Sequence, residues 1–67
     1  MDRIKHITQE DANIILNLYN EGKAYLCEGL FLFRSNKHIW TAIDNSSGDC
    51  FTEDFKSKEK AEEWLLI

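Results

Sequence analysis

The feature that most constrains this chain is a change of hydrophobic period at Gly22, within 67 residues that contain no proline. Before Gly22 the apolar residues recur at helical spacing, and after it they alternate or cluster as they do in strands. Thr8 is followed three residues later by Asp11, a capping-box pattern with Asp in place of Glu. Gly22 indicates the C-cap. The sequence therefore predicts a helix of about twelve residues, with an apolar face made of Ala12, Ile15, Leu16 and Tyr19.

After Gly22 the sequence predicts a meander of three strands. Strong turn signals, rich in Asn, Ser and Gly, separate the apolar stretches. The strands are expected at residues 30–33, 38–44 and 49–55, with turns at 35–37 and 45–48.

The two ends of this meander have their own signals. Residues 25–27 suggest a short extended piece, and Glu28-Gly29 a bend or bulge. Ser57 can cap a last helix, on which Ala61, Trp64 and Leu65 share one face. We therefore expect one small α+β domain over residues 1–67, in the order helix, three-stranded antiparallel meander, helix.

The register of the strands decides which side chains share a face of the sheet. If Asn36-Lys37 is a two-residue turn, Phe33 lies opposite Trp40. A four-residue turn at 45–48 would place Phe51 opposite Ala42. One face then holds Phe31, Phe33, Trp40, Ala42 and Phe51, and the other holds Leu30, Leu32, Ile39, Thr41, Ile43, Cys50 and Thr52. A bulge at Gly48 would instead exchange the faces of the third strand, and the sequence leaves both registers open.

Both predicted faces are largely apolar, and two short helices on the same side could cover only one of them. An uncovered apolar face on a small domain usually marks a contact with another chain. We therefore expect a homodimer or a partner-binding face that uses Leu30, Leu32, Ile39 and Ile43. The alternative is a monomer in which each helix covers one face. The final residues 64–67 are expected to pack, or else to serve as an apolar grip for a partner.

The net charge is concentrated in one part of the chain. Residues 1–43 carry five acids and five bases, whereas residues 44–67 carry seven acids and three bases, which gives the whole net charge of −4. Such a surface suits a basic protein partner and speeds encounter at low salt. The alternative is a solvated face that keeps the protein in solution, with local Glu–Lys pairing. The candidate partner-binding acids are Asp44, Asp49, Glu53, Asp54, Glu59, Glu62 and Glu63.

Motifs for catalysis or cofactor binding are lacking, so we expect no enzyme, no cofactor and no metal. Cys27, Cys50, His6 and His38 stand in none of the close pairs that zinc sites use, and the cysteines are expected to be small buried hydrophobes. No glycine-rich phosphate loop occurs, and no apolar run is long enough to span a bilayer. With no secretory signal behind the first charges, a cytoplasmic location is expected.

A nucleic-acid-binding sheet is a further alternative. Four aromatic side chains could stack single-stranded bases, but only Arg34 and Lys37 supply cations near them. Core packing is therefore the favoured role of these aromatics, and direct nucleic-acid binding is disfavoured. The four are Phe31, Phe33, Trp40 and Phe51.

Residues 39–55, followed by Ser57 and 61–65, form a tryptophan strand, an Asp-Asn-x-x-Gly turn, an acidic strand and a short helix ending in Trp-Leu. This half of the chain resembles small uncharacterised proteins carried by phages and other mobile elements of Gram-positive bacteria. The resemblance implies a small inhibitor or modulator of a host nucleic-acid-binding protein or nuclease. We therefore expect an acidic protein-binding module. The alternatives are a structural or regulatory homodimer without enzymatic role and a single-strand nucleic-acid binder.

Overall fold

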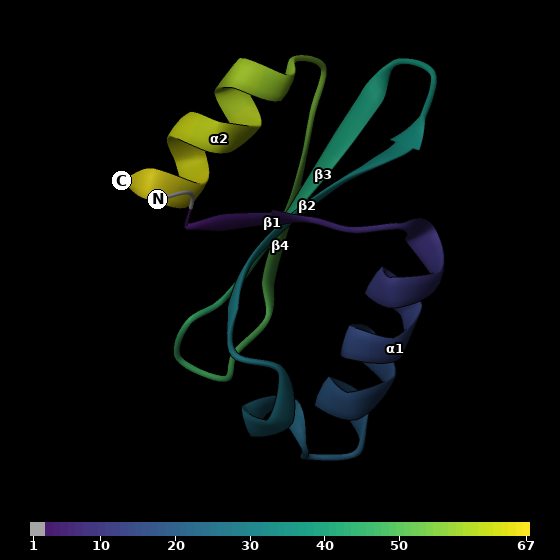
Figure 1. The fold of residues 1–67 in the computed structure, drawn as a ribbon, viewed down its shortest axis with the longest axis vertical. Coiled ribbons are helices and arrows are strands. Elements are labelled where there is room, and N and C mark those ends of the chain that lie inside the picture. Colours follow the sequence, from purple (N-terminus) through teal and green to yellow (C-terminus); the bar gives the residue numbers. More distant parts are fainter. Residues whose placement is uncertain (1–2) are drawn as a thin grey trace.

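A four-stranded sheet forms the middle layer of the fold, between helices on opposite faces (Figure 1). The computed structural model describes residues 3–67. Along the chain the elements are β1 (Ile4–His6), α1 (Gln9–Asn20), the 3-10 helix η1 (Ala24–Cys27), β2 (Gly29–Asn36), β3 (Ile39–Asn45), β4 (Phe51–Phe55) and α2 (Lys58–Leu66). The strand order is β1-β2-β3-β4, with β1 parallel to β2 and the other pairs antiparallel. The predicted α+β class is confirmed.

The predicted sheet was wrong in its number of strands and in being purely antiparallel. The first strand, β1, pairs Ile4 with Leu30 and His6 with Leu32. A three-residue strand with a single apolar residue shows no alternation in the sequence, so it gives no strand signal. Its parallel pairing depends on the crossover through α1 and η1, which returns the chain to the same end of the sheet.

The first helix forms over the predicted span because its two ends are specified locally, although Tyr19, predicted on its apolar face, is exposed. The Thr8 hydroxyl accepts a hydrogen bond from the Asp11 N–H at 3.1 Å, and the Asp11 carboxylate accepts one from the Thr8 N–H at 3.4 Å. At the other end the C-cap is Glu21, and Gly22 follows it with φ 75°. Lys23 N–H then donates to Leu18 O at 2.7 Å, which closes a Schellman motif.

The second helix also begins where the sequence predicted. The Ser57 hydroxyl accepts a hydrogen bond from the Lys60 N–H at 3.2 Å. Ala61 and Leu65 are buried against the sheet, and Trp64 packs beside them with its ring 5.8 Å from that of Phe55. The predicted shared face of this helix is therefore confirmed.

The turn between β2 and β3 lies at Lys37-His38, one residue later than predicted. The later turn shifts the pairing by two residues, and a bulge between Arg34 and Asn36 takes back only one of them. The Asn36 side chain accepts a hydrogen bond from the His38 N–H at 2.8 Å. In consequence Phe33 lies opposite Thr41 rather than Trp40, and the predicted face of β2 was wrong.

The β3–β4 connection is longer than the predicted four-residue turn. Ala42 lies opposite Glu53, and Asp44 lies opposite Phe51, so the predicted pairing of Ala42 with Phe51 was wrong by two residues. A shift of two preserves the faces, and Phe51 remains on the same face as Ala42. Of the two registers left open for this strand, the one in which a bulge exchanges its faces does not occur.

The core is divided between the two faces of the sheet because neighbouring residues in a strand point to opposite sides. The α1 side contains Ala12, Ile15, Ala24, Phe31, Phe33, Ile43 and Cys50. The α2 side contains Ile4, Leu30, Leu32, Ala42, Ala61 and Leu65, with Trp40, Phe55 and Trp64 packed against them.

A buried asparagine joins three segments on the α1 side. Asn45 is fully buried at the end of β3. Its side-chain amide donates to Ala24 O at 3.0 Å and to Cys27 O at 2.7 Å, and its carbonyl oxygen accepts from Cys50 N–H at 3.3 Å. Residues 24–27 therefore form a 3-10 turn fixed to the sheet, and the predicted extended piece was wrong. Asn45 itself belongs to a strand and not to the predicted turn.

Within residues 3–67, no helix combines the length and the apolar character needed to cross a membrane.

Candidate protein-contact surface

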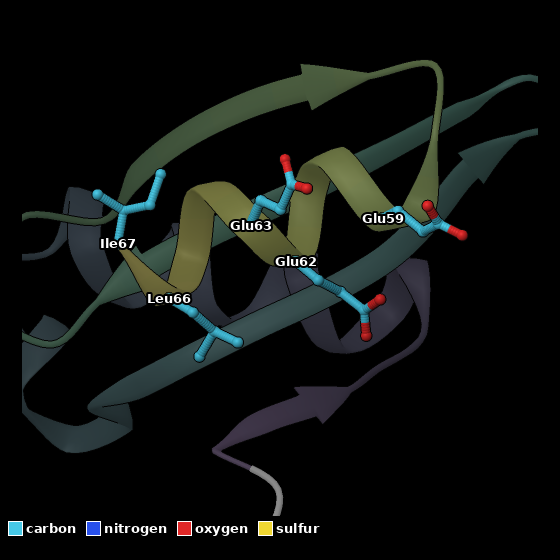
Figure 2. Close-up of a pocket in the computed structure, with 5 residues that line it drawn as sticks. All are labelled: Glu59, Glu62, Glu63, Leu66 and Ile67. Atoms are coloured by element: carbon cyan, nitrogen blue, oxygen red, sulfur yellow. The ribbon is translucent and has the colours of Figure 1, made fainter.

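The outer side of α2 carries a shallow, open hollow of about 490 Å³, lined by Glu59, Glu62, Glu63, Leu66 and Ile67 (Figure 2). We call these five residues the α2 surface. The four residues within the helix follow the spacing i, i+3, i+4, i+7, which places them on one stripe of an α-helix. The buried pair Ala61 and Leu65 lies on the opposite stripe. The same periodicity that packs α2 onto the sheet therefore turns three carboxylates and two apolar side chains outward.

Exposed apolar area lies directly beside these carboxylates. Leu66 is 51% exposed and Ile67 fully exposed. Of the predicted apolar ending, Leu65 is packed and Leu66 and Ile67 are not. Apolar side chains rimmed by charged groups are typical of surfaces that contact another macromolecule. This surface can supply hydrophobic contact at the C-terminal end of α2 and electrostatic selection for a basic partner along the rest of the stripe (Figure 2).

The other four candidate acids lie on β3, on β4 and in the loop between them, and none of them lines the hollow on α2. Glu53 is exposed on β4, opposite Ala42. Asp54 lies on the other face of the sheet, where it accepts a hydrogen bond from the Thr41 hydroxyl at 2.7 Å. Because the strand alternates, these two neighbours in the sequence cannot belong to one face.

The two remaining acids shape the loop after β3. Asp44 accepts hydrogen bonds from the Ser46 N–H at 3.0 Å and from the Ser46 hydroxyl at 2.7 Å. Asp49 accepts one from the Ser47 hydroxyl at 2.9 Å. The structure thus brings together Glu59, Glu62 and Glu63 in one lining, to which the other four acids do not belong.

The predicted apolar contact residues do not form an exposed face. Leu30 and Leu32 are buried under α2, and Ile43 is buried under α1. Ile39 is half-buried. The four do not share one face, because β2 is flipped relative to the predicted register, and neither face is open, because a helix covers each of them. The layout with one helix on each face is confirmed, so the homodimer hypothesis loses the apolar face on which it depended.

The aromatic residues do not form a stacking face either. Phe31 and Phe33 are buried against α1, as the core-packing interpretation predicted, while Trp40 lies on the other side of the sheet. For Phe51, which is exposed, that interpretation was wrong. The Arg34 guanidinium carbon and the Lys58 ammonium nitrogen each lie 5.7 Å from the centre of the Trp40 ring. No local pattern pointed to Lys58, because only the return of α2 across the sheet brings it to Trp40.

Cys27 and Cys50 are free thiols on the α1 side of the sheet. Cys50 is buried, as expected, and Cys27 is half-buried. Burial chiefly, and then the nearby Cys27 and Asp49, raise the pKa of the Cys50 thiol above its ordinary value of 9.0. A raised pKa keeps the thiol protonated at neutral pH, which makes it a weak nucleophile. Among residues 3–67 no three His, Cys, Asp or Glu side chains are grouped so as to hold a metal ion.

The comparisons with known proteins yield no relative: no protein-family model, no curated protein and no solved structure matches this chain.

Proposed function

We propose that this chain is a protein-binding module whose α2 surface contacts a basic partner. The observation that carries the proposal is the combination of Leu66 and Ile67, both exposed, with three glutamates on one stripe of the helix. The apolar pair provides surface whose burial against a partner lowers the free energy of the complex. The glutamates favour cationic partners and penalise acidic ones.

The distribution of charge supports a basic partner. Residues 44–67 hold the whole net charge of −4, so their field attracts a positively charged protein before contact. In the setting that the phage-protein resemblance suggests, the partner is a host nucleic-acid-binding protein or nuclease, because such proteins present basic surfaces. Binding there would compete with phosphate, which makes the chain an inhibitor or modulator of its partner.

The experiment compares three tagged proteins in pull-downs from a Gram-positive bacterial lysate at low and high salt, read by mass spectrometry. They are the wild type, the variant Glu62→Lys/Glu63→Lys, and the control Glu21→Lys/Glu28→Lys. Both variants remove the same net charge, but the control alters exposed acids outside the α2 surface. We expect one basic, salt-sensitive partner with the wild type and the control, and its loss with the α2 variant.

The result is then quantified with the purified partner by calorimetry. Loss of several charge contacts at an interface is expected to weaken binding at least tenfold at low salt, and by less at high salt, where the charges are screened. Equal capture by all three proteins, with circular dichroism showing each of them folded, would contradict the proposal.

A further inference from the structure

The strand β4 is an open edge of the sheet. It is the last strand in the order β1-β2-β3-β4, and no further strand flanks it within residues 3–67. Four of its five residues are exposed, from Phe51 to Asp54. Alternate backbone N–H and C=O groups of such a strand point away from its neighbour, so they are available to another extended segment.

The side chains of β4 specify what this edge can accept. Glu53 lies between Phe51 and Phe55 on the face toward α2, while Thr52 and Asp54 lie on the other face. An added strand would therefore meet a carboxylate on each face and an aromatic ring at each end. Phe51 is 58% exposed, which leaves its ring free to contact a cross-strand neighbour.

A second copy of the chain fits this edge poorly. A two-fold antiparallel pairing centred on β4 would set Glu53 directly against Glu53 of the other copy, and like charges opposite each other destabilise a sheet. Lys or Arg at the same positions would form favourable cross-strand pairs with Glu53 and Asp54. The charge pattern thus selects a basic strand over self-association.

The edge also adjoins the α2 surface. The helix α2 packs against β3 and β4. Figure 2 shows Glu63 and Ile67 on the side of the helix turned toward β4. A stable protein interface covers about 800 Å² of each partner, roughly a sixth of this molecule's 4751 Å². The outer stripe of a nine-residue helix is too small for that area, whereas α2 and the β4 edge together form a larger continuous region.

We propose that β4 accepts an extended basic segment of the partner as a fifth, antiparallel strand. The segment carries two consecutive Lys or Arg residues opposite Asp54 and Glu53, with an aromatic or β-branched residue on either side. The inference rests on the proposed function, since it names how the same basic partner is held. Main-chain hydrogen bonds would provide the affinity, and the two carboxylates would provide the specificity.

The test uses the synthetic peptide Thr-Val-Arg-Lys-Thr-Tyr-Thr, added to isotope-labelled protein and followed by NMR. We expect the largest amide shifts at residues 51–55 and slower hydrogen exchange of the β4 amides that face outward. A control peptide of the same sequence is N-methylated at alternate residues, so it keeps its charge but cannot complete the hydrogen-bond ladder. That control should not bind at the concentrations that saturate the first peptide.

Two matched variants separate the edge from the helix. Glu53→Gln/Asp54→Asn removes both edge charges, and the Asn side chain can still accept the Thr41 hydrogen bond. We expect it to weaken peptide binding about tenfold, whereas Glu62→Gln/Glu63→Gln should change the affinity of this short peptide by less than about twofold.

Three outcomes would overturn strand addition, and they treat the proposed function differently. If the methylated peptide binds equally well and shifts amide resonances on the α2 surface, the fifth strand is contradicted but the α2 surface is supported as the contact. A second outcome is that the peptide fails to bind at millimolar concentration while a basic partner is captured through Glu62 and Glu63. That result also contradicts the fifth strand and supports the α2 surface as the contact. If neither the peptide nor a basic protein binds, both proposals are wrong.

Discussion

The two faces of the sheet are covered by helices of different construction. On one face α1 has twelve residues, a reciprocal capping box and a Schellman motif, and the buried Asn45 fixes the adjoining 3-10 turn. On the other face α2 has nine residues and one side-chain cap, and it is held by aliphatic and aromatic packing. Residues 1–43 are neutral, whereas residues 44–67 carry the net charge of −4. Directional hydrogen bonds therefore reinforce the packing on the α1 side, while the α2 side depends mainly on packing and carries the acidic outer surface.

The largest expected effect concerns the polar contacts of the α1 side. Replacing Asn45→Asp removes the amide donor and sets a buried carboxylate against two carbonyl oxygens, those of Ala24 and Cys27. We expect a loss of about 3–5 kcal/mol in the free energy of unfolding, measured by urea denaturation. The same substitution at exposed Asn13 provides the control, since a carboxylate there can still accept the hydrogen bond from Gln9. Similar midpoints for the two variants would show that the α1 side does not depend on these bonds.

The corresponding change on the α2 side tests packing instead of hydrogen bonding. Leu65→Ala should cost about 2–4 kcal/mol, because a side chain that is 3% exposed leaves a cavity. Its neighbour Leu66→Ala, on the outer stripe, should change stability by less than about 0.5 kcal/mol and yet weaken partner binding. Urea denaturation and calorimetry measure the two effects separately. If Leu66→Ala destabilised the chain as much as Leu65→Ala, the outer stripe would have to be part of the core.

The two helix caps provide a smaller contrast. Thr8→Ala breaks the reciprocal pair with Asp11, while Ser57→Ala breaks a single bond to Lys60. We expect losses of about 1–1.5 kcal/mol and about 0.5–1 kcal/mol respectively, by thermal or urea unfolding. The reverse ranking would indicate that α2 needs its cap more than α1 does, and that packing contributes less to α2 than the structure indicates.

The smallest effect is a dependence of stability on alkaline pH. Because the pKa of Cys50 is raised in the folded chain, the unfolded thiol loses its proton first as the pH rises above 9.0. The contribution of Cys50 is therefore present below its ordinary pKa and is lost as the pH rises toward the folded value. We expect urea midpoints to fall between pH 8 and pH 10 by more in the wild type than in Cys50→Ala. Parallel pH curves for the two proteins would contradict this.

Elements with local signals could be predicted from the sequence, and elements that depend on distant contacts could not. Both helices were correctly placed because their end signals act within a few residues. These signals are the N-caps Thr8 and Ser57, and Gly22 just after α1. β1 becomes a strand only by pairing with β2, and the 3-10 turn is held by Asn45 from about twenty positions further along the chain. Neither interaction leaves a periodic pattern in the sequence.

The candidate surface follows the same division. The helical spacing of Glu59, Glu62 and Glu63 is visible in the sequence, and it correctly implies that the three lie together. The separation of Asp54 from Glu53 depends on strand alternation, and the exposed Leu66 and Ile67 could not be told from a packed ending. The one-residue bulge near Arg34 had the widest effect, because it reversed the faces of β2 relative to β3 and so divided the predicted dimer residues between the two sides of the sheet.

The α2-side cluster joins elements from both ends of the described chain, since Ile4 packs in the same cluster as Leu65. This contact closes a loop that spans nearly the whole described chain, so its entropic cost is high and it is expected to form late in folding. A ribosome-bound chain that has not yet released α2 can pair β2 with β3, but it cannot close this half of the core. Until synthesis has passed α2, Leu30 and Leu32 would remain open to chaperones, and the α2 surface would not yet exist.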